Sequence, residues 1–276
     1  MKEINEAKFA AEIKKIKRKK VMIVVFTVIA ILAVAFFSTP SRYEIMGNVI
    51  EIEGIGVAAA IILCAVCFVI EFFAVAVVYI PLSSTMLQEC DPERNLVLND
   101  AFNKTKSRDV NLAMDYFYLG YYEKSVISAE KSLNSSIDNI ALSALFNKAR
   151  ALFFMEGYEA FYKISDDYEA RLLNAKKLNP KNRAMYESIN TMLKLMRYVA
   201  VGDAEKINEL RGLVKSWNTS KATDCFVSYI KGLAAYKVGD TEEAIYNFRC
   251  AREIGEKTEL ADLADNYLTL IRLEND

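Results

Sequence analysis

A run of apolar residues from Gly56 to Ile80 sets the architecture open to this chain. The run reads GVAAAIILCAVCFVIEFFAVAVVYI and carries one charge, on Glu71. About 20 apolar residues are enough for a helix to cross the hydrocarbon core of a bilayer, so this run can span one with some tilt. The sequence therefore predicts a membrane helix at 56–80, followed by a helical domain at 81–276.

A second apolar stretch, Val21–Ser38, lies upstream and contains no charged residue. A signal peptide usually has an apolar core of about 7 to 15 residues behind a short charged leader, and here both parts are longer. We therefore interpret 21–38 as an uncleaved span that ends before Pro40. Together with 56–80, it predicts a two-helix transmembrane hairpin over residues 21–80.

The distribution of charge predicts how this hairpin is oriented. Residues 1–20 carry eight Lys or Arg and three Glu, whereas the short loop at 39–55 carries one Arg and three Glu. Because basic flanks stay in the cytoplasm, we expect 1–20 and 81–276 to be cytoplasmic and the protein to be a multi-pass protein of the cell membrane. Phe9, Ile13 and Ile16 also share a helical face of the leader, which is typical either of a plain topology signal or of a helix that lies on anionic membrane lipid.

Glu71 lies near the middle of the second predicted span. A carboxylate there costs about 2.5 to 3.5 kcal/mol on insertion scales, and such groups usually face protein or water. One hypothesis is a transport or proton site. The other is a protonated or hydrogen-bonded group that holds together the two helices of one chain or the protomers of a homo-oligomer. We favour the second, because two helices make a small membrane part for a transporter.

The composition narrows the function of the predicted domain. The chain has no histidine, which removes the commonest general base and most zinc and haem sites. Residues 81–276 carry 26 basic and 29 acidic residues, which gives no support for nucleic-acid binding. No phosphate loop or nucleophile motif is found. The spacing of the five cysteines fits neither a metal site nor a disulfide framework; they are Cys64, Cys67, Cys90, Cys225 and Cys250. We therefore expect that the protein is not an enzyme and that it binds no cofactor and no metal.

Helical patterns recur through the domain, and each pair of helices meets at a glycine. A glycine at a helix C-terminus adopts the left-handed conformation without steric cost, and recurrence at this period is typical of a solenoid of helical hairpins. We also expect a helix from Pro92 to about residue 104, capped by Asp91, and a terminal helix from Thr258 to Leu273. The glycines, separated by 37, 45 and 37 residues, are Gly120, Gly157, Gly202 and Gly239.

One of these units resembles a tetratricopeptide (TPR) repeat. Gly232 stands at the small position of its first helix and Gly239-Asp240 at its turn, while Ala244, Phe248 and Ala251 match the second helix. The other units depart from the pattern, with Ser125, Ser132 and Ile207 where alanine is usual. The resemblance implies an all-α fold in which an α-solenoid of TPR-like hairpins forms a right-handed superhelix, whose concave groove binds a peptide or another protein segment.

The groove of such an array would be lined mainly by first helices. Arg and Asn side chains at such positions commonly bind peptide backbone or carboxylates. Four basic residues among the candidates, Arg150, Lys194, Arg197 and Lys231, predict a mildly basic groove suited to an acidic segment. The full set of groove candidates is Asn111, Asp115, Tyr118, Asn147, Arg150, Asn190, Lys194, Arg197, Ser228, Lys231 and Tyr236.

Three hypotheses for the function follow. The first is a membrane-anchored scaffold or adaptor that recruits partner proteins through its cytoplasmic TPR-like groove. The second is an accessory subunit of a membrane transporter or secretion complex, which it would contact through the transmembrane hairpin and Glu71. The third, and the weakest, is a histidine-free catalytic site in the groove. Capture of the partner by 91–276 alone would favour the first, and loss of capture on Glu71→Leu would favour the second.

Overall fold

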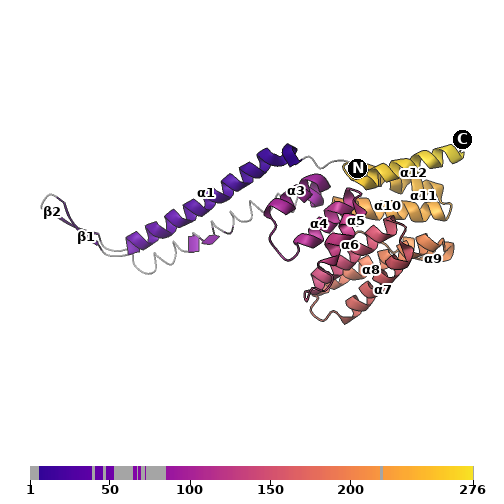
Figure 1. The fold of residues 1–276 in the computed structure, drawn as a ribbon, viewed down its shortest axis with the longest axis horizontal. Coiled ribbons are helices and arrows are strands. Elements are labelled where there is room, and N and C mark those ends of the chain that lie inside the picture. The colour runs from indigo at the N-terminus through magenta and orange to yellow at the C-terminus, as the bar shows by residue number, and fades with distance from the viewer. Residues whose placement is uncertain are drawn as a thin grey trace. The chain divides into compact units, whose positions relative to one another are not determined.

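The computed structural model describes residues 6–38, 41–45, 48–52, 65–66, 68–69, 72, 85–217 and 220–275 (Figure 1). The chain divides into two units, Met1–Ser83 and Ser84–Asp276. The described residues contain eleven α-helices, one short π-helix and one two-stranded sheet. The prediction of an all-α fold is confirmed for the helical domain. The first unit also contains a small hairpin of two strands.

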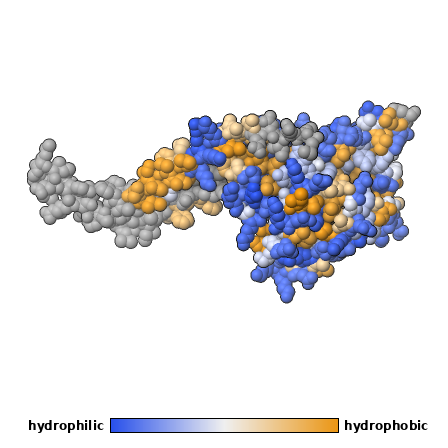
Figure 2. Space-filling view, in the orientation of Figure 1, coloured by the Kyte–Doolittle hydropathy of each residue, from blue (hydrophilic) through white to orange (hydrophobic). Residues whose placement is uncertain are grey.

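In the first unit, helix α1 (Glu6–Ser38) joins the basic leader and the first apolar stretch into one element of 33 residues. It ends two residues before Pro40, as predicted, because proline has no amide hydrogen and clashes with the preceding turn. Its apolar half exposes large side chains, among them Val21 at 62%, Phe26 at 62% and Leu32 at 63%. Figure 2 shows this half of α1 in the hydrophobic colour.

The loop predicted at 39–55 contains an antiparallel hairpin, formed by β1 (Ser41–Ile45) and β2 (Asn48–Ile52). Tyr43 pairs with Ile50 in the register, and in the sequence of β1 charged residues alternate with apolar ones from Arg42 to Ile45. Such alternation is typical of strands, in which aromatic and β-branched residues are common. The hairpin signal was therefore present in a segment that we predicted to be only a loop.

The structure tests only one of the two predicted membrane spans. Nearly all of 56–80, Glu71 included, lies outside the described residues. Within the described part of the chain, no helix combines the length and the apolar character needed to cross a membrane. The span predicted at 21–38 is therefore not supported, and attachment to a membrane stays a proposal.

The second unit is a series of helical hairpins in chain order. Consecutive helices pack as the pairs α4–α5, α6–α7, α8–α9 and α10–α11, and α12 closes the series on α10 and α11. The first helices of successive pairs also touch, α4 with α6, α6 with α8 and α8 with α10. The elements are η1 (Thr85–Glu89), α3 (Pro92–Phe102), α4 (Arg108–Tyr118), α5 (Tyr122–Glu130), α6 (Asp138–Phe154), α7 (Tyr158–Asn174), α8 (Pro180–Val201), α9 (Ala204–Arg211), α10 (Lys221–Lys237), α11 (Thr241–Ile254) and α12 (Glu259–Asn275).

The helix ends follow the predicted signals with one exception. Asp91 caps α3 by accepting a hydrogen bond from the Arg94 amide, and Asp240 caps α11 by accepting one from the Glu243 amide. Three of the four predicted glycines have positive φ, but Gly157 does not, since Glu156 takes the left-handed conformation there with φ 57°. The position of the turn between α6 and α7 was predicted correctly. The prediction that Gly157 adopts the left-handed conformation was wrong, because Glu156 adopts it instead.

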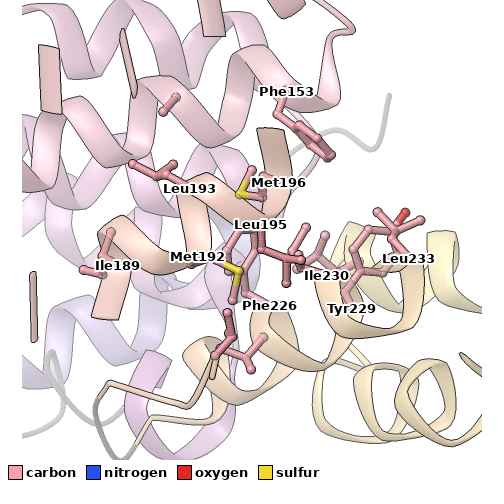
Figure 3. Close-up of a cluster of buried hydrophobic side chains, with 14 of the residues drawn as sticks. Phe153, Ile189, Met192, Leu193, Leu195, Met196, Phe226, Tyr229, Ile230 and Leu233 are labelled. Atoms are coloured by element: carbon pink, nitrogen blue, oxygen red, sulfur yellow. The ribbon is translucent and has the colours of Figure 1, made fainter. Parts of the chain in front are cut away.

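Short residues let the fourth hairpin pack closely. Ala244, Phe248 and Ala251 of α11 are fully buried against α10. They belong to a larger hydrophobic cluster, in which Figure 3 shows residues of α8 and α10, such as Met192, Leu195 and Ile230. Burial of this apolar surface drives the packing, at roughly 25 cal/mol per Å².

Gly232 of α10 leaves a gap that a methyl group would overfill. A Cβ at this position would lie 2.8 Å from the Phe248 ring. Alanine normally stabilises a helix interior by about 1 kcal/mol over glycine, but overpacking costs about 1 to 3 kcal/mol. We therefore expect Gly232→Ala to lower the free energy of unfolding by up to about 2 kcal/mol in denaturant titrations of the full chain, followed by Trp217, the single tryptophan.

Gly212 supplies a matched control for this prediction. It follows α9 with φ −74°, and a Cβ there would meet nothing within 4 Å. Gly212→Ala should therefore leave the free energy of unfolding unchanged or raise it by about 0.4 to 1 kcal/mol. Equal effects of the two substitutions would contradict the close contact at Gly232.

The series of hairpins closes on itself instead of remaining open. Tyr118 of α4 donates a hydrogen bond to the Ala222 carbonyl of α10 at 2.6 Å, and the rings of Phe117 and Phe226 lie 5.7 Å apart. The turn at Gly120 approaches Glu259 of α12 so closely that a Cβ would lie 3.0 Å from its side chain. The first hairpin therefore packs against the last, across more than 100 residues of sequence.

Candidate functional site

A line of buried polar side chains connects α3 to α4, and we call it the polar ladder: Thr85, Asn95, Asn99, Asn103 and Asp115. Asn95 and Asn99 donate to the two carboxyl oxygens of Asp115 at 2.6 and 3.1 Å. Asn103 donates to Asn99 at 3.2 Å, and the Thr85 hydroxyl donates to Asn95 at 2.5 Å. All five side chains are buried, so the ladder satisfies polar groups that would otherwise destabilise the core.

Asp115 is the titratable member of the polar ladder. Its complete burial raises the pKa of the carboxyl group to about 8, although the amides of Asn95 and Asn99 and the charge of Arg150 act in the opposite direction. Burial wins because transfer of a carboxylate out of water costs more than two amide hydrogen bonds return. The folded protein therefore holds a proton here at a pH where an exposed aspartate has none.

Arg150 of α6 lies among aromatic rings in the core. Its Cζ atom is 4.1 Å from the centre of the Phe117 ring and within 6 Å of the rings of Tyr118, Phe146 and Phe226. The residue is 3% exposed, and its Nε and Nη2 have no hydrogen-bond partner among the described atoms. Burial lowers the pKa of the guanidinium. Cation–π contacts, worth up to about 2 kcal/mol each when desolvated, offset part of the cost of burying this charge.

Two more groove candidates lie in the same core. Tyr118 bridges α4 and α10 through its hydroxyl group, and Asn147 donates to the Val110 carbonyl at 2.9 Å. Asp115, Tyr118, Asn147 and Arg150 are thus brought together, but inside the helical domain. Contact of Tyr118 or Arg150 with a partner would require α4 and α10 to separate, whereas Asp115 is covered by α3.

The candidates on α8 remain accessible at the surface. Lys194 pairs with Glu169 at 2.7 Å and Arg197 with Asp166 at 2.8 Å, so both cations are bridged to α7. Asn190 also donates to Glu169, at 3.4 Å. We call these residues the α7–α8 charged strip. The hydrogen bond from Lys194 holds the pKa of Glu169 below its ordinary value.

The remaining candidates lie on α4 and α10 and are partly buried. Ser228 and Lys231 lie on α10, and Asn111 lies near the start of α4. The hydroxyl group of Tyr236 donates to Glu274 at 2.8 Å, and its ring packs on Tyr267. The four basic candidates therefore do not form one surface, since Arg150 is interior while Lys194 and Arg197 are paired.

The polar ladder was missed from the sequence, although a signal was present. Asn95, Asn99 and Asn103 follow one another at intervals of four residues, which places them on one face of a helix. Three asparagines on the same face, next to apolar Leu96 and Leu98, indicate a buried polar contact. We interpreted this helix only through its apolar positions.

The described part of the chain contains no group of three or more His, Cys, Asp or Glu residues that could hold a metal ion. The candidate sites of the helical domain are thus the buried polar residues around Asp115 and Arg150 and the accessible α7–α8 charged strip. No family model matches the chain, and no curated protein or solved structure matches it either.

Proposed function

We propose that this chain is a membrane-tethered scaffold that binds partner proteins through the outer surface of a TPR-like helical domain. The observation that carries the proposal is the α7–α8 charged strip. In it, Asn190, Lys194 and Arg197 lie together on one face of α8, while Asp115, Tyr118, Asn147 and Arg150 are buried.

The strip has the chemistry of a protein-binding surface. Arg197 stacks on the Tyr162 ring at 4.9 Å, and Arg and Tyr are enriched where interfaces concentrate their binding energy. The ion pairs with Glu169 and Asp166 are exposed, so each is worth about 0 to 1 kcal/mol and can be exchanged at low cost. An acidic segment of a partner would compete for the same two cations.

The tether in this proposal rests on sequence and exposure. Residues 21–38 and 56–80 are apolar, and α1 leaves several of its large apolar side chains uncovered. The basic leader favours a cytoplasmic N-terminus and, through two crossings, a cytoplasmic helical domain.

Charge reversal of the strip tests the proposal. The full chain carrying Lys194→Glu and Arg197→Glu should lose at least about tenfold of its captured partner, equivalent to about 1.4 kcal/mol, because each substitution repels an acidic segment. The matched control is Lys206→Glu with Arg252→Glu, which reverses two exposed cations that are also ion-paired. The readout is affinity capture of solubilised protein with quantitative mass spectrometry.

Equal losses in both double variants would contradict a specific role of the strip. Glu71→Leu in the full chain separates the runner-up function, an accessory subunit that contacts a larger membrane protein. If capture fails on Glu71→Leu and survives reversal of the strip, the second function replaces the first.

A further inference from the structure

Two buried thiols from distant parts of the chain meet where the helical domain begins. Cys90 follows η1 and is 1% exposed, and Cys225 of α10 is fully buried. Cys90 lies close enough to Cys225 to raise the pKa of its thiol, and η1 packs on α10. Both sulfur atoms are free thiols.

Contacts of the residues on either side of Cys90 also hold this segment close to Cys225. Asp91, next to Cys90, pairs with Lys257 at 2.7 Å. The sulfur of Cys225 lies 3.4 Å from the Ala251 carbonyl oxygen and 3.9 Å from the hydroxyl group of Thr258, the neighbour of Lys257. On the other side, the Ser220 hydroxyl donates to the Met86 carbonyl at 3.4 Å. The segment 86–91 is therefore held along the start of α10.

The backbone at Cys90 is unusual. Its φ is 49°, a left-handed conformation that side chains with a Cβ rarely adopt and that costs about 1 to 3 kcal/mol. The Asp91 amide closes η1 by donating to the Thr85 carbonyl at 3.1 Å. This conformation turns the chain from η1 into α3 and leaves the Cys90 thiol against α10.

We propose that Cys90 and Cys225 are a reversible dithiol–disulfide pair that links η1 to α10 when a hydroperoxide oxidises the protein. The inference is independent of the proposed scaffold function. It assigns a modification site within the second unit, close to where that unit begins.

The reaction balances with a hydroperoxide as the oxidant. The Cys90 sulfur attacks the O–O bond, which breaks to give a sulfenic acid and release an alcohol or water. The Cys225 sulfur then attacks the Cys90 sulfur, so that the S–S bond forms, the S–O bond breaks and water leaves. Two electrons pass from the two thiols to the hydroperoxide, and both thiol protons end in the hydroxyl products.

The surroundings explain why the pair stays reduced at rest. The neighbouring Cys90 and burial raise the pKa of the Cys225 thiol, which keeps it protonated and a poor nucleophile. Cys90 lies in a short link whose neighbours Gln88 and Glu89 are exposed, so local opening of η1 uncovers it first. Cys225 is enclosed under α11 and becomes the second thiol to react.

Peptide mapping of the oxidised full chain tests the proposal. Reduced, solubilised protein is treated with hydrogen peroxide, free thiols are blocked, and proteolytic peptides are identified by mass spectrometry without reduction. We expect the Cys90–Cys225 linked peptide as the main disulfide, a higher unfolding midpoint of the oxidised protein, and return of both to the starting state on reduction.

Cys225→Ser should abolish the linked peptide, and Cys250→Ser, at a partly exposed cysteine, should retain it. The wild-type map decides the matter even if Cys225→Ser folds poorly. The proposal is overturned if native protein gives no Cys90–Cys225 peptide while Cys250 is oxidised under the same conditions. It is equally overturned if the link forms only after the protein has been unfolded in denaturant.

Discussion

Replacing Asp115 by Asn is expected to remove a large part of the pH dependence of folding stability between about pH 4 and 8. The folded carboxyl group has a pKa of about 8 because it is completely buried, whereas the unfolded group has an ordinary value near 3.8. Between these values the folded state binds one more proton than the unfolded state, so stability falls as the pH rises, by about 1.4 kcal/mol per unit.

The sign of the effect therefore depends on pH. Near pH 4 wild type and Asp115→Asn should have similar stability, because the folded carboxyl group is neutral and the unfolded one is half protonated. At pH 8 the variant should be more stable by several kcal/mol, on the order of 5. Asparagine keeps the shape of the side chain, and its amide oxygen can still accept a hydrogen bond from Asn95 or Asn99.

Denaturant titrations at several pH values measure this difference directly. Wild type and variant are compared at each pH, so the low-pH measurement is the internal control for the cost of altering the polar ladder. Two parallel curves of unfolding free energy against pH would show that Asp115 is ionised in the folded state, which would contradict a buried, neutral carboxyl group.

Replacing Phe226 by Ala is expected to lower the free energy of unfolding by about 3 to 5 kcal/mol, since it removes a fully buried ring and leaves a cavity. The Phe226 ring packs on Phe117 and Phe146, at 5.7 and 5.8 Å. It is also one of the rings around Arg150, so its loss leaves a buried cation less well compensated.

The same variant should change the environment of Trp217, whose ring lies 6.3 Å from that of Phe226. We expect the tryptophan emission of folded Phe226→Ala to shift to longer wavelength as water reaches the ring. Tyr246→Ala is the control, because this side chain of α11 is 67% exposed, and its loss should cost within about 0.5 kcal/mol. Similar losses in the two variants would contradict the central position of Phe226.

Local features of the helical domain were predictable from the sequence. Asp91, Asp240 and the turn glycines carry capping and turn chemistry that acts within four residues. The starts of α3 and α11 and the positions of the four turns followed from them. The exception at Glu156 is also local. A non-glycine residue can take the left-handed conformation where the turn demands it, and a glycine next to it gives a misleading signal.

Closure of the array was not predictable in the same way. The hydrogen bond from Tyr118 to Ala222 spans 104 residues, and it depends on the summed angles between several hairpins. A small change in each angle separates an open superhelix from a closed one, and no motif of a single hairpin encodes that sum. For this reason Tyr118 and Arg150 had the right spacing for a groove and are nevertheless interior. Asp115 is instead buried by its contacts with α3, and Asn147 by its contact with α4.

The accessible candidates were predictable for the opposite reason. Asn190, Lys194 and Arg197 lie at intervals of three and four residues on α8, so they share a face whatever the rest of the array does. What the sequence could not supply was their pairing with Asp166 and Glu169 of α7, which depends on how two neighbouring helices align.

A double-mutant cycle between Phe117 and Phe226 measures the closure of the array most directly. The two rings belong to the first and fourth hairpins and lie 5.7 Å apart, edge to face. The free energy of unfolding is measured for wild type, Phe117→Leu, Phe226→Leu and the double variant. A closed array predicts a coupling energy of about 0.5 to 1.5 kcal/mol, and effects that add to within about 0.3 kcal/mol would show that the first and last hairpins do not touch.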